Sequence, residues 1–117
     1  YTSEAAQRLL NEAARYLGTP YVWGGYSPSG FDCSGFVSYC LVHSGVRNTG
    51  RLTAQGLYNI CTPVSQSDAQ PGDLILYEGH VGIYMGDGKI INAMNEAQGI
   101  GVCSATYTNI VAVRRVL

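Results

Sequence analysis

Cys33 stands at the start of an apolar segment, within Phe31-Asp32-Cys33-Ser34-Gly35-Phe36-Val37. Asp32 suits a helix N-cap, because its carboxylate accepts from the free N–H groups of a first turn. Apolar residues then recur at helical spacing and Gly45 suits the stop, which predicts a helix over about 32–44. The positive end of that helix favours a thiolate over a thiol, so Cys33 is a candidate nucleophile.

A cysteine nucleophile needs a base and a third group that orients the base. The chain has two histidines, His43 and His80. His43 lies about 15 Å from Cys33 along the same predicted helix at 1.5 Å per residue, which excludes it as this base. His80, at the start of a predicted strand, is therefore the candidate base.

The candidate for the third group is Asn92, and its position depends on the turn at 86–88. A three-residue turn, with Gly88 left-handed, places Gly82 opposite Asn92 and puts Asn92 one diagonal step from His80 on the same face. A two-residue turn would put Asn92 on the opposite face. The amide oxygen of Asn92 can then fix the imidazole tautomer, as Asp or Asn does in Cys-His hydrolases.

Composition favours one compact domain over residues 1–117, since 46% of the residues are hydrophobic. The formal net charge of −1 gives no electrostatic reason to expect nucleic acid or an anionic membrane as partner. No apolar run approaches the roughly 20 residues of a membrane span, so no membrane insertion is expected. Because Tyr1 is not an initiator Met, we expect a domain excised from a longer secreted precursor.

The other three cysteines, Cys40, Cys61 and Cys103, are expected in the core, where free cysteine is common. A disulfide between Cys61 and Cys103 stays open, because connectivity cannot be deduced from sequence. Cys40 and His43 have the spacing of half a zinc site. Structural zinc sites usually show two tight ligand pairs, so we predict no metal site.

The remaining pattern predicts helices first and strands afterwards. One helix is expected over 3–17, with Leu17 on its apolar stripe, and a short helix over 54–60 is capped by Thr53. The strands are too close together for crossover helices, which predicts an antiparallel sheet and an α+β domain with the helices on one face. The five predicted strands are Leu74–Tyr77, His80–Met85, Lys89–Met94, Ile100–Cys103 and Ile110–Val116.

Five motifs, in order along nearly the whole chain, resemble the NlpC-type cell-wall peptidases. They are Gly18-Thr19-Pro20-Tyr21-Val22-Trp23-Gly24-Gly25, Phe31-Asp32-Cys33-Ser34-Gly35-Phe36-Val37, Arg51-Leu52-Thr53-Ala54-Gln55, Pro71-Gly72-Asp73-Leu74 and Gly79-His80-Val81-Gly82-Ile83-Tyr84-Met85-Gly86. The resemblance implies a reduced papain-like fold and secreted cysteine peptidases that act on peptidoglycan stem peptides. The usual scissile bond joins γ-D-glutamate to the diamino acid.

By position, the resemblance makes Cys33 the nucleophile, His80 the base and Asn92 the third polar residue. The family usually has His at the position of Asn92, within an Ile-His-Ala-like segment that reads Ile91-Asn92-Ala93 here. Asn is chemically competent there, because this residue orients the base and moves no proton. We expect the departure to affect the pH profile more than the activity, and no cofactor is needed.

The resemblance also implies substrate-binding residues. Tyr21, Asp32 and Ser34 match positions that line the pocket for the L-Ala and D-Glu part of the stem, and Thr53 stands where Ser is frequent. Arg51 matches an often basic position, where it either meets a stem-peptide carboxylate or is a solvated surface arginine. A further motif residue, the chain's single tryptophan, is interpreted as a core aromatic: Trp23.

Two other functions remain open at this stage. The same site can serve an amidase or transferase acting on a neighbouring stem-peptide bond. A catalytically silent wall-binding module is the other alternative, and the retained Cys33 and His80 argue against it. In each case we expect a secreted, extracellular or wall-located chain whose partner is peptidoglycan and which carries further lytic or wall-binding domains.

Overall fold

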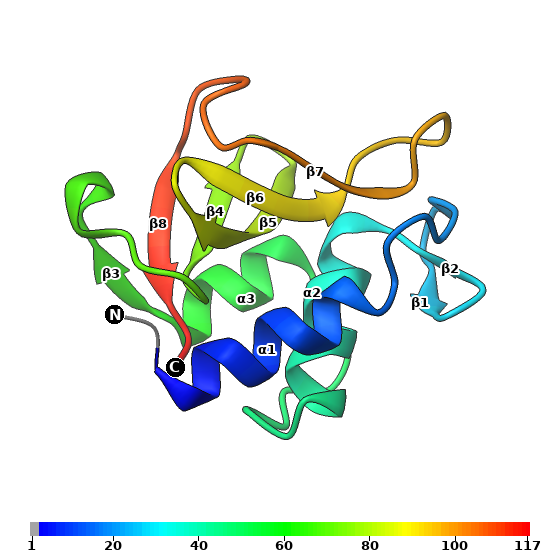
Figure 1. The fold of residues 1–117 in the computed structure, drawn as a ribbon, viewed down its shortest axis with the longest axis horizontal. Coiled ribbons are helices and arrows are strands. Elements are labelled where there is room, and N and C mark those ends of the chain that lie inside the picture. The colour runs from blue at the N-terminus through cyan, green and yellow to red at the C-terminus, as the bar shows by residue number, and fades with distance from the viewer. Residues whose placement is uncertain (1–2) are drawn as a thin grey trace.

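The computed structural model describes residues 3–117, in which the helices lie on one face of an antiparallel sheet (Figure 1). The helices are α1 (Glu4–Ala14), α2 (Cys33–His43) and α3 (Ala54–Ile60), followed by a 3-10 turn, η1 (Gln66–Asp68). The main sheet has the order β3-β8-β4-β5-β6-β7. Its strands are β3 (Thr62–Val64), β4 (Leu74–Tyr77), β5 (His80–Gly86), β6 (Lys89–Ala93), β7 (Ile100–Ser104) and β8 (Ala112–Arg115). The predicted α+β class is confirmed.

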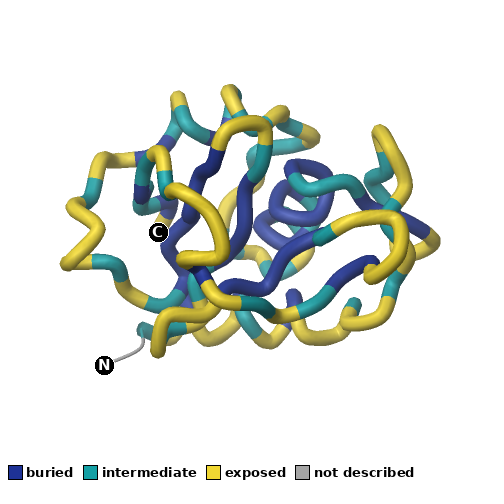
Figure 2. The backbone as a smooth tube through the Cα atoms, turned by 90° about the horizontal axis from the view of Figure 1, so that it is seen from above, coloured by how far each residue is buried: buried dark blue, intermediate teal, exposed yellow. Residues whose placement is uncertain are grey.

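Helix α2 is the buried centre of the fold, packed against α1, α3, β5 and β6. Figure 2 shows it as a largely buried coil. Asp32 caps it, accepting from the N–H of Gly35 at 2.7 Å, as predicted. Gly35 is required by packing, because a Cβ there would lie 2.0 Å from the carbonyl oxygen of Gly25. The loop before α2 is therefore pressed against its first turn.

Helix α1 ends at Ala14, three residues before the predicted end. The chain then turns away, and Gly18 adopts a φ of 86° that suits glycine. The N–H of Gly18 donates to the carbonyl of Ile100, and the N–H of Ile100 donates to the carbonyl of Thr19. These contacts tie the segment after α1 to the start of β7 and leave Leu17 exposed, so its predicted place on the buried stripe is wrong.

The turn between β5 and β6 differs from the three-residue turn that we expected. Gly86 pairs with Lys89, leaving a two-residue turn in which Asp87 and Gly88 both have positive φ. That turn alone would have moved Asn92 to the wrong face. A bulge at Met85 inserts one extra residue into β5 and restores the predicted register. The register pairs Ile83 with Ile91 and Tyr84 with Ile90.

The sheet has six strands where five were predicted, because Thr62–Val64 pairs with β8 at one edge. Pro63 does not prevent this pairing, because proline is tolerated on an edge strand, where its missing N–H costs no ladder bond. A second difference is a small hairpin of β1 (Tyr26–Ser27) and β2 (Gly30–Phe31), where no strand was predicted. Within residues 3–117, no helix has both the length and the apolar character that a membrane crossing requires.

Candidate active site

The thiol of Cys33 is half-buried at the N-terminus of α2. Burial, with a smaller contribution from the Asp32 carboxylate, raises its pKa above the ordinary value, although backbone N–H groups of Val81, Ser34 and Cys33 oppose this. The N–H groups at the start of α2 thus favour the thiolate, as predicted, but removing its charge from water costs more, so the pKa is raised overall. Because the Val81 N–H acts on the thiol and Val81 directly follows His80, the sulfur lies close to the start of β5.

His80 begins β5, and its Nε2 lies 2.8 Å from Oδ1 of Asn92 on β6. Burial lowers the pKa of His80, while the hydrogen bond to Asn92 acts in the opposite direction. Gly82 provides the space for this contact, because a Cβ there would lie 3.1 Å from Cβ of Asn92. The structure thus joins His80 and Asn92 as the sequence predicted.

The amide of Asn92 is almost completely buried, and its contacts with β7 fix its orientation. Its Nδ2 donates to the carbonyl of Gly101 at 3.4 Å and approaches Sγ of Cys103 at 3.5 Å, both on β7. Oδ1 therefore faces His80 and accepts from Nε2–H, which leaves Nδ1 as the basic nitrogen of the ring.

Three tyrosines surround this pair and the thiol. The ring of Tyr77 lies 5.9 Å from that of His80 and 5.2 Å from that of Tyr107. Burial raises the pKa of Tyr107, and nearby Cys103 and Cys33 raise it further. Burial and the charges of Cys33, Asp32 and Glu96 likewise raise the pKa of Tyr21. The phenols of Tyr21 and Tyr107 therefore stay protonated near neutral pH.

A charged cluster lies at the N-cap of α2, next to Cys33 in the sequence. Arg51 donates to both carboxylate oxygens of Asp32, at 2.9 and 3.1 Å, and to Oγ of Ser34 at 3.1 Å. The backbone N–H of Gly24 also donates to Asp32, at 3.1 Å. Arg51 is thus held by an ion pair and is not a freely solvated surface residue.

Two further sequence predictions have different outcomes. Thr53 caps α3, as predicted, by accepting from the N–H of Gly56 at 3.1 Å. Trp23 was interpreted as a core aromatic, but 86% of it is exposed, so that interpretation is wrong. Trp23 lies in a turn with the two glycines that follow it, near the start of α2. A sequence motif does not show in which direction a side chain projects from such a turn.

The four cysteines are all free in residues 3–117. Cys40 and Cys61 are buried, as expected, whereas Cys103 is half-buried beside Asn92. The candidate residues that sequence reasoning missed are Cys103 and Tyr107. Cys103 could have been found from the pairing of β6 with β7, because this pairing places it opposite Ile90, two residues from Asn92.

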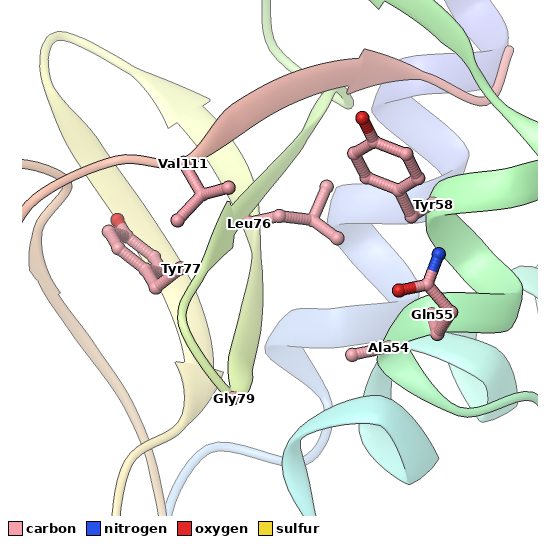
Figure 3. Close-up of a pocket in the computed structure, with 7 residues that line it drawn as sticks. All are labelled: Ala54, Gln55, Tyr58, Leu76, Tyr77, Gly79 and Val111. Atoms are coloured by element: carbon pink, nitrogen blue, oxygen red, sulfur yellow. The ribbon is translucent and has the colours of Figure 1, made fainter.

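Two hollows lie near the His80–Asn92 pair. One, of about 490 Å³, lies between α3 and the end of β4, where Gln55 and Tyr58 face Leu76, whereas Tyr77 projects from the opposite side of β4 (Figure 3). Its rim includes Gly79, the residue before His80. The second, of about 230 Å³, is lined by Asn92, Met94, Asn95, Gln98, Cys103 and Tyr107. The second hollow therefore reaches Asn92, and the first reaches the residue next to His80.

A thiol at a helix start and an imidazole held by an amide on adjacent strands are the groups that thiol-dependent hydrolases of papain-like arrangement use. The chain belongs to the NlpC/P60 family, whose family model matches residues 18–115. This confirms the resemblance to NlpC-type peptidases.

Individual relatives agree with the assignment. The chain is 46% identical over 92 residues to "Probable endopeptidase p60" of Listeria seeligeri, a match that covers 74% of this chain and 17% of that protein. It is 40% identical over 96 residues to "Bifunctional muramidase/DL-endopeptidase CwlT" of Bacillus subtilis, covering 74% of this chain and 29% of that protein. The chain therefore spans less than a third of the length of these curated relatives.

A solved structure shows the same fold. The crystal structure of the NlpC/p60 domain of the peptidoglycan hydrolase SagA superposes with a TM-score of 0.85 at 35% identity. The match covers 95% of this chain and 98% of that one. The order of helices and strands described above is thus that of a solved domain of the family.

Proposed function

We propose that this domain hydrolyses peptidoglycan stem peptides by a Cys-His-Asn thiol mechanism, at the bond between γ-D-glutamate and the L-diamino acid. The observation that carries the proposal is the 2.8 Å contact between His80 and Asn92, beside the Val81 N–H that faces the Cys33 sulfur. Family membership supports it, as do relatives named as endopeptidases, one of them a DL-endopeptidase.

The first step forms a thioester. The raised pKa of Cys33 and the lowered pKa of His80 leave both groups neutral near pH 7. Nδ1 of His80 takes the thiol proton while the sulfur attacks the γ-carbonyl carbon. The N–H of Cys33 and the hydroxyl of Tyr21 stabilise the oxyanion. The C–N bond then breaks, and His80 passes its proton to the leaving amine.

The second step restores the enzyme. His80 removes a proton from water, whose oxygen attacks the thioester carbon. The C–S bond breaks, the sulfur recovers a proton from His80, and the product carries a free γ-carboxylate. Asn92 keeps its contact with Nε2 throughout, so Nδ1 alone exchanges protons. The scheme uses no metal and no organic cofactor.

The charged cluster is proposed to bind the acyl side of the substrate. A γ-linked glutamate keeps its α-carboxylate, and Arg51 presents a guanidinium that is one-third exposed beside Asp32. Ser34 accepts a hydrogen bond from this guanidinium, and Thr53 follows Arg51 by two residues. We also propose an extracellular or cell-wall location and further domains in the same chain, since this domain is a minor part of its relatives.

The test is digestion of purified muropeptides followed by mass spectrometry. The wild-type domain should release a new γ-D-glutamate carboxyl end and a new diamino-acid amine, whereas an amidase releases N-terminal L-Ala and a transferase adds mass to one fragment. Cys33→Ala should abolish cleavage with the fold retained by circular dichroism, and Cys61→Ala is the control that removes a thiol elsewhere. Full activity of Cys33→Ala, or binding without turnover by the wild type, would contradict the proposal.

A further inference from the structure

A shallow groove of about 520 Å³ lies between the segment after α1 and the turn that joins β6 to β7. Its lining residues are Tyr21, Trp23, Met94, Asn95, Glu96 and Ala97. Trp23 is 86% exposed, so most of its indole surface is available to a ligand. An exposed tryptophan at a groove is a common mark of a binding surface, because leaving it in water gains no burial energy.

The groove is acidic as well as aromatic. Glu96 supplies a carboxylate, and none of the residues that line the groove is basic. The ion pairs within residues 3–117 join Arg15 to Glu12, Arg51 to Asp32 and Arg115 to Asp73, and none of them involves Glu96. A carboxylate without a counter-ion and an exposed indole line the same groove, and each attracts a cation.

Tyr21 connects this groove to the reaction centre. Its phenol lies close enough to both the Cys33 sulfur and the Glu96 carboxylate for their charges to act on it. Tyr21 also pairs with Phe31, two residues before Cys33, so the groove opens next to the nucleophile.

We propose that this groove binds the side-chain ammonium of the diamino acid on the leaving side of the scissile bond, between the face of Trp23 and the carboxylate of Glu96. The inference rests on the proposed function and extends it to the substrate class. A lysine side chain suits the site, since it ends in a compact ammonium on a flexible four-carbon stem.

The same geometry discriminates between stem peptides. Diaminopimelate carries a carboxylate on the carbon that bears its side-chain ammonium. Glu96 repels that carboxylate, and no basic side chain in the groove compensates it. We therefore expect a preference for lysine, or for diaminopimelate whose carboxylate is amidated, over free diaminopimelate.

The decisive comparison uses two synthetic stem peptides that differ by one charge. One carries lysine after γ-D-glutamate and the other carries Nε-acetyl-lysine. The ratio of their kcat/KM values should favour the free ammonium by about 3- to 30-fold, as expected for one exposed cation–π contact and one exposed ion pair. Glu96→Gln should lower that ratio by about 2- to 5-fold, and Trp23→Leu should lower it more than Trp23→Phe.

A matched control removes a carboxylate elsewhere. Asp87 lies in the β5–β6 turn, at the other end of the strand from His80, and Asn tolerates its positive φ. Asp87→Asn should leave the ratio unchanged. A ratio of one in the wild type, or a ratio that Glu96→Gln does not lower, would overturn the proposal while peptide hydrolysis stands.

Two further outcomes are also informative. If the wild type cleaves neither peptide, the proposed function fails, and the ratio of the two dissociation constants from calorimetry then tests the groove itself. If Trp23→Leu removes only the gain from a disaccharide attached to the stem, the groove binds sugar and the ammonium proposal is wrong.

Discussion

Two neighbouring regions use hydrogen bonds of nearly equal length in opposite electrostatic settings. His80 and Asn92 meet at 2.8 Å on adjacent strands, and burial keeps the imidazole neutral by lowering its pKa. Asp32 and Arg51 meet at 2.9 Å at the rim of α2, in reach of solvent, as a charged pair. The length of a hydrogen bond therefore does not reveal whether its partners are charged. The charge state depends on how far each group is removed from water.

The two regions are therefore suited to different roles. The buried pair needs neutral groups that exchange one proton along a fixed direction, so a rigid strand pairing suits it. The rim pair is suited to attract and orient a charged substrate, and it also holds the first turn of α2 in place through Asp32. The following predictions test this division, beginning with the largest effect.

Replacing His80 should have the largest effect. His80→Ala should lower kcat/KM for a stem peptide by about 10³-fold or more, since it removes the proton carrier of both steps. His43→Ala is the matched control, because that ring is stacked on Tyr39 on the far part of α2. Steady-state kinetics of both variants provide the measurement, and a loss of similar size in His43→Ala would contradict the assignment.

Asn92 should matter less than His80, because it positions the ring without exchanging a proton. Asn92→Ala should lower kcat by about 10²-fold with a smaller change in KM. Asn92→Asp should restore most of kcat and move the acid limb of the pH profile upward, because a buried carboxylate favours the imidazolium. An unchanged pH profile in Asn92→Asp would argue that residue 92 does not act through His80.

The pH dependence follows from the two shifted pKa values. The acid limb of kcat/KM should lie below the ordinary His value of 6.5, because protonation of His80 removes the base. The thiol of Cys33 should react with iodoacetamide at pH 7 more slowly than a free cysteine, since its thiolate fraction is reduced. Mass spectrometry assigns the labelled residue, and rapid alkylation of Cys33 at pH 6 would contradict this prediction.

The rim pair should give the smallest effects on stability. Asp32→Ala removes the cap of α2 and should cost about 1–2 kcal/mol in the free energy of unfolding. Arg51→Gln should cost less than about 1 kcal/mol, because the guanidinium remains partly solvated. Urea denaturation measures both. Equal losses in the two variants would show that the ion pair, and not the cap, holds the first turn.

For substrate binding, Arg51→Gln should raise KM for a stem peptide more than it lowers kcat, because the guanidinium meets the α-carboxylate and not the reacting γ-carbonyl. A neutral analogue, in which the α-carboxylate of the γ-linked D-glutamate is amidated, should be insensitive to the same substitution. A fall in kcat alone would place Arg51 in the chemistry instead.

Local patterns predicted much of the fold. Asp32 and Thr53 cap their helices because a short polar side chain next to free N–H groups is sufficient for a cap. The strand at Leu74–Tyr77 has the predicted bounds. The contact between His80 and Asn92 was also predicted, although by a compensation: the turn was misassigned, and the bulge at Met85 restored the register.

Features that depend on distant contacts were missed. The edge strand Thr62–Val64 exists only because β8 returns along it. The exposure of Trp23 depends on the orientation of its loop. This loop packs against α2 where Gly25 meets Gly35 of the helix. The relation of Cys103 to Asn92 requires the β6–β7 register, which no single segment contains.

The amino-acid order by itself determined which residues are able to do chemistry, and where caps and turns interrupt the chain, because those features depend on near neighbours. Only the tertiary structure decided the charge state of the thiol and imidazole, the pairing of Arg51 with Asp32, and the acidic aromatic groove at Trp23. The physical reason is that burial and long-range packing set how much water each group loses, and a linear pattern does not contain that quantity.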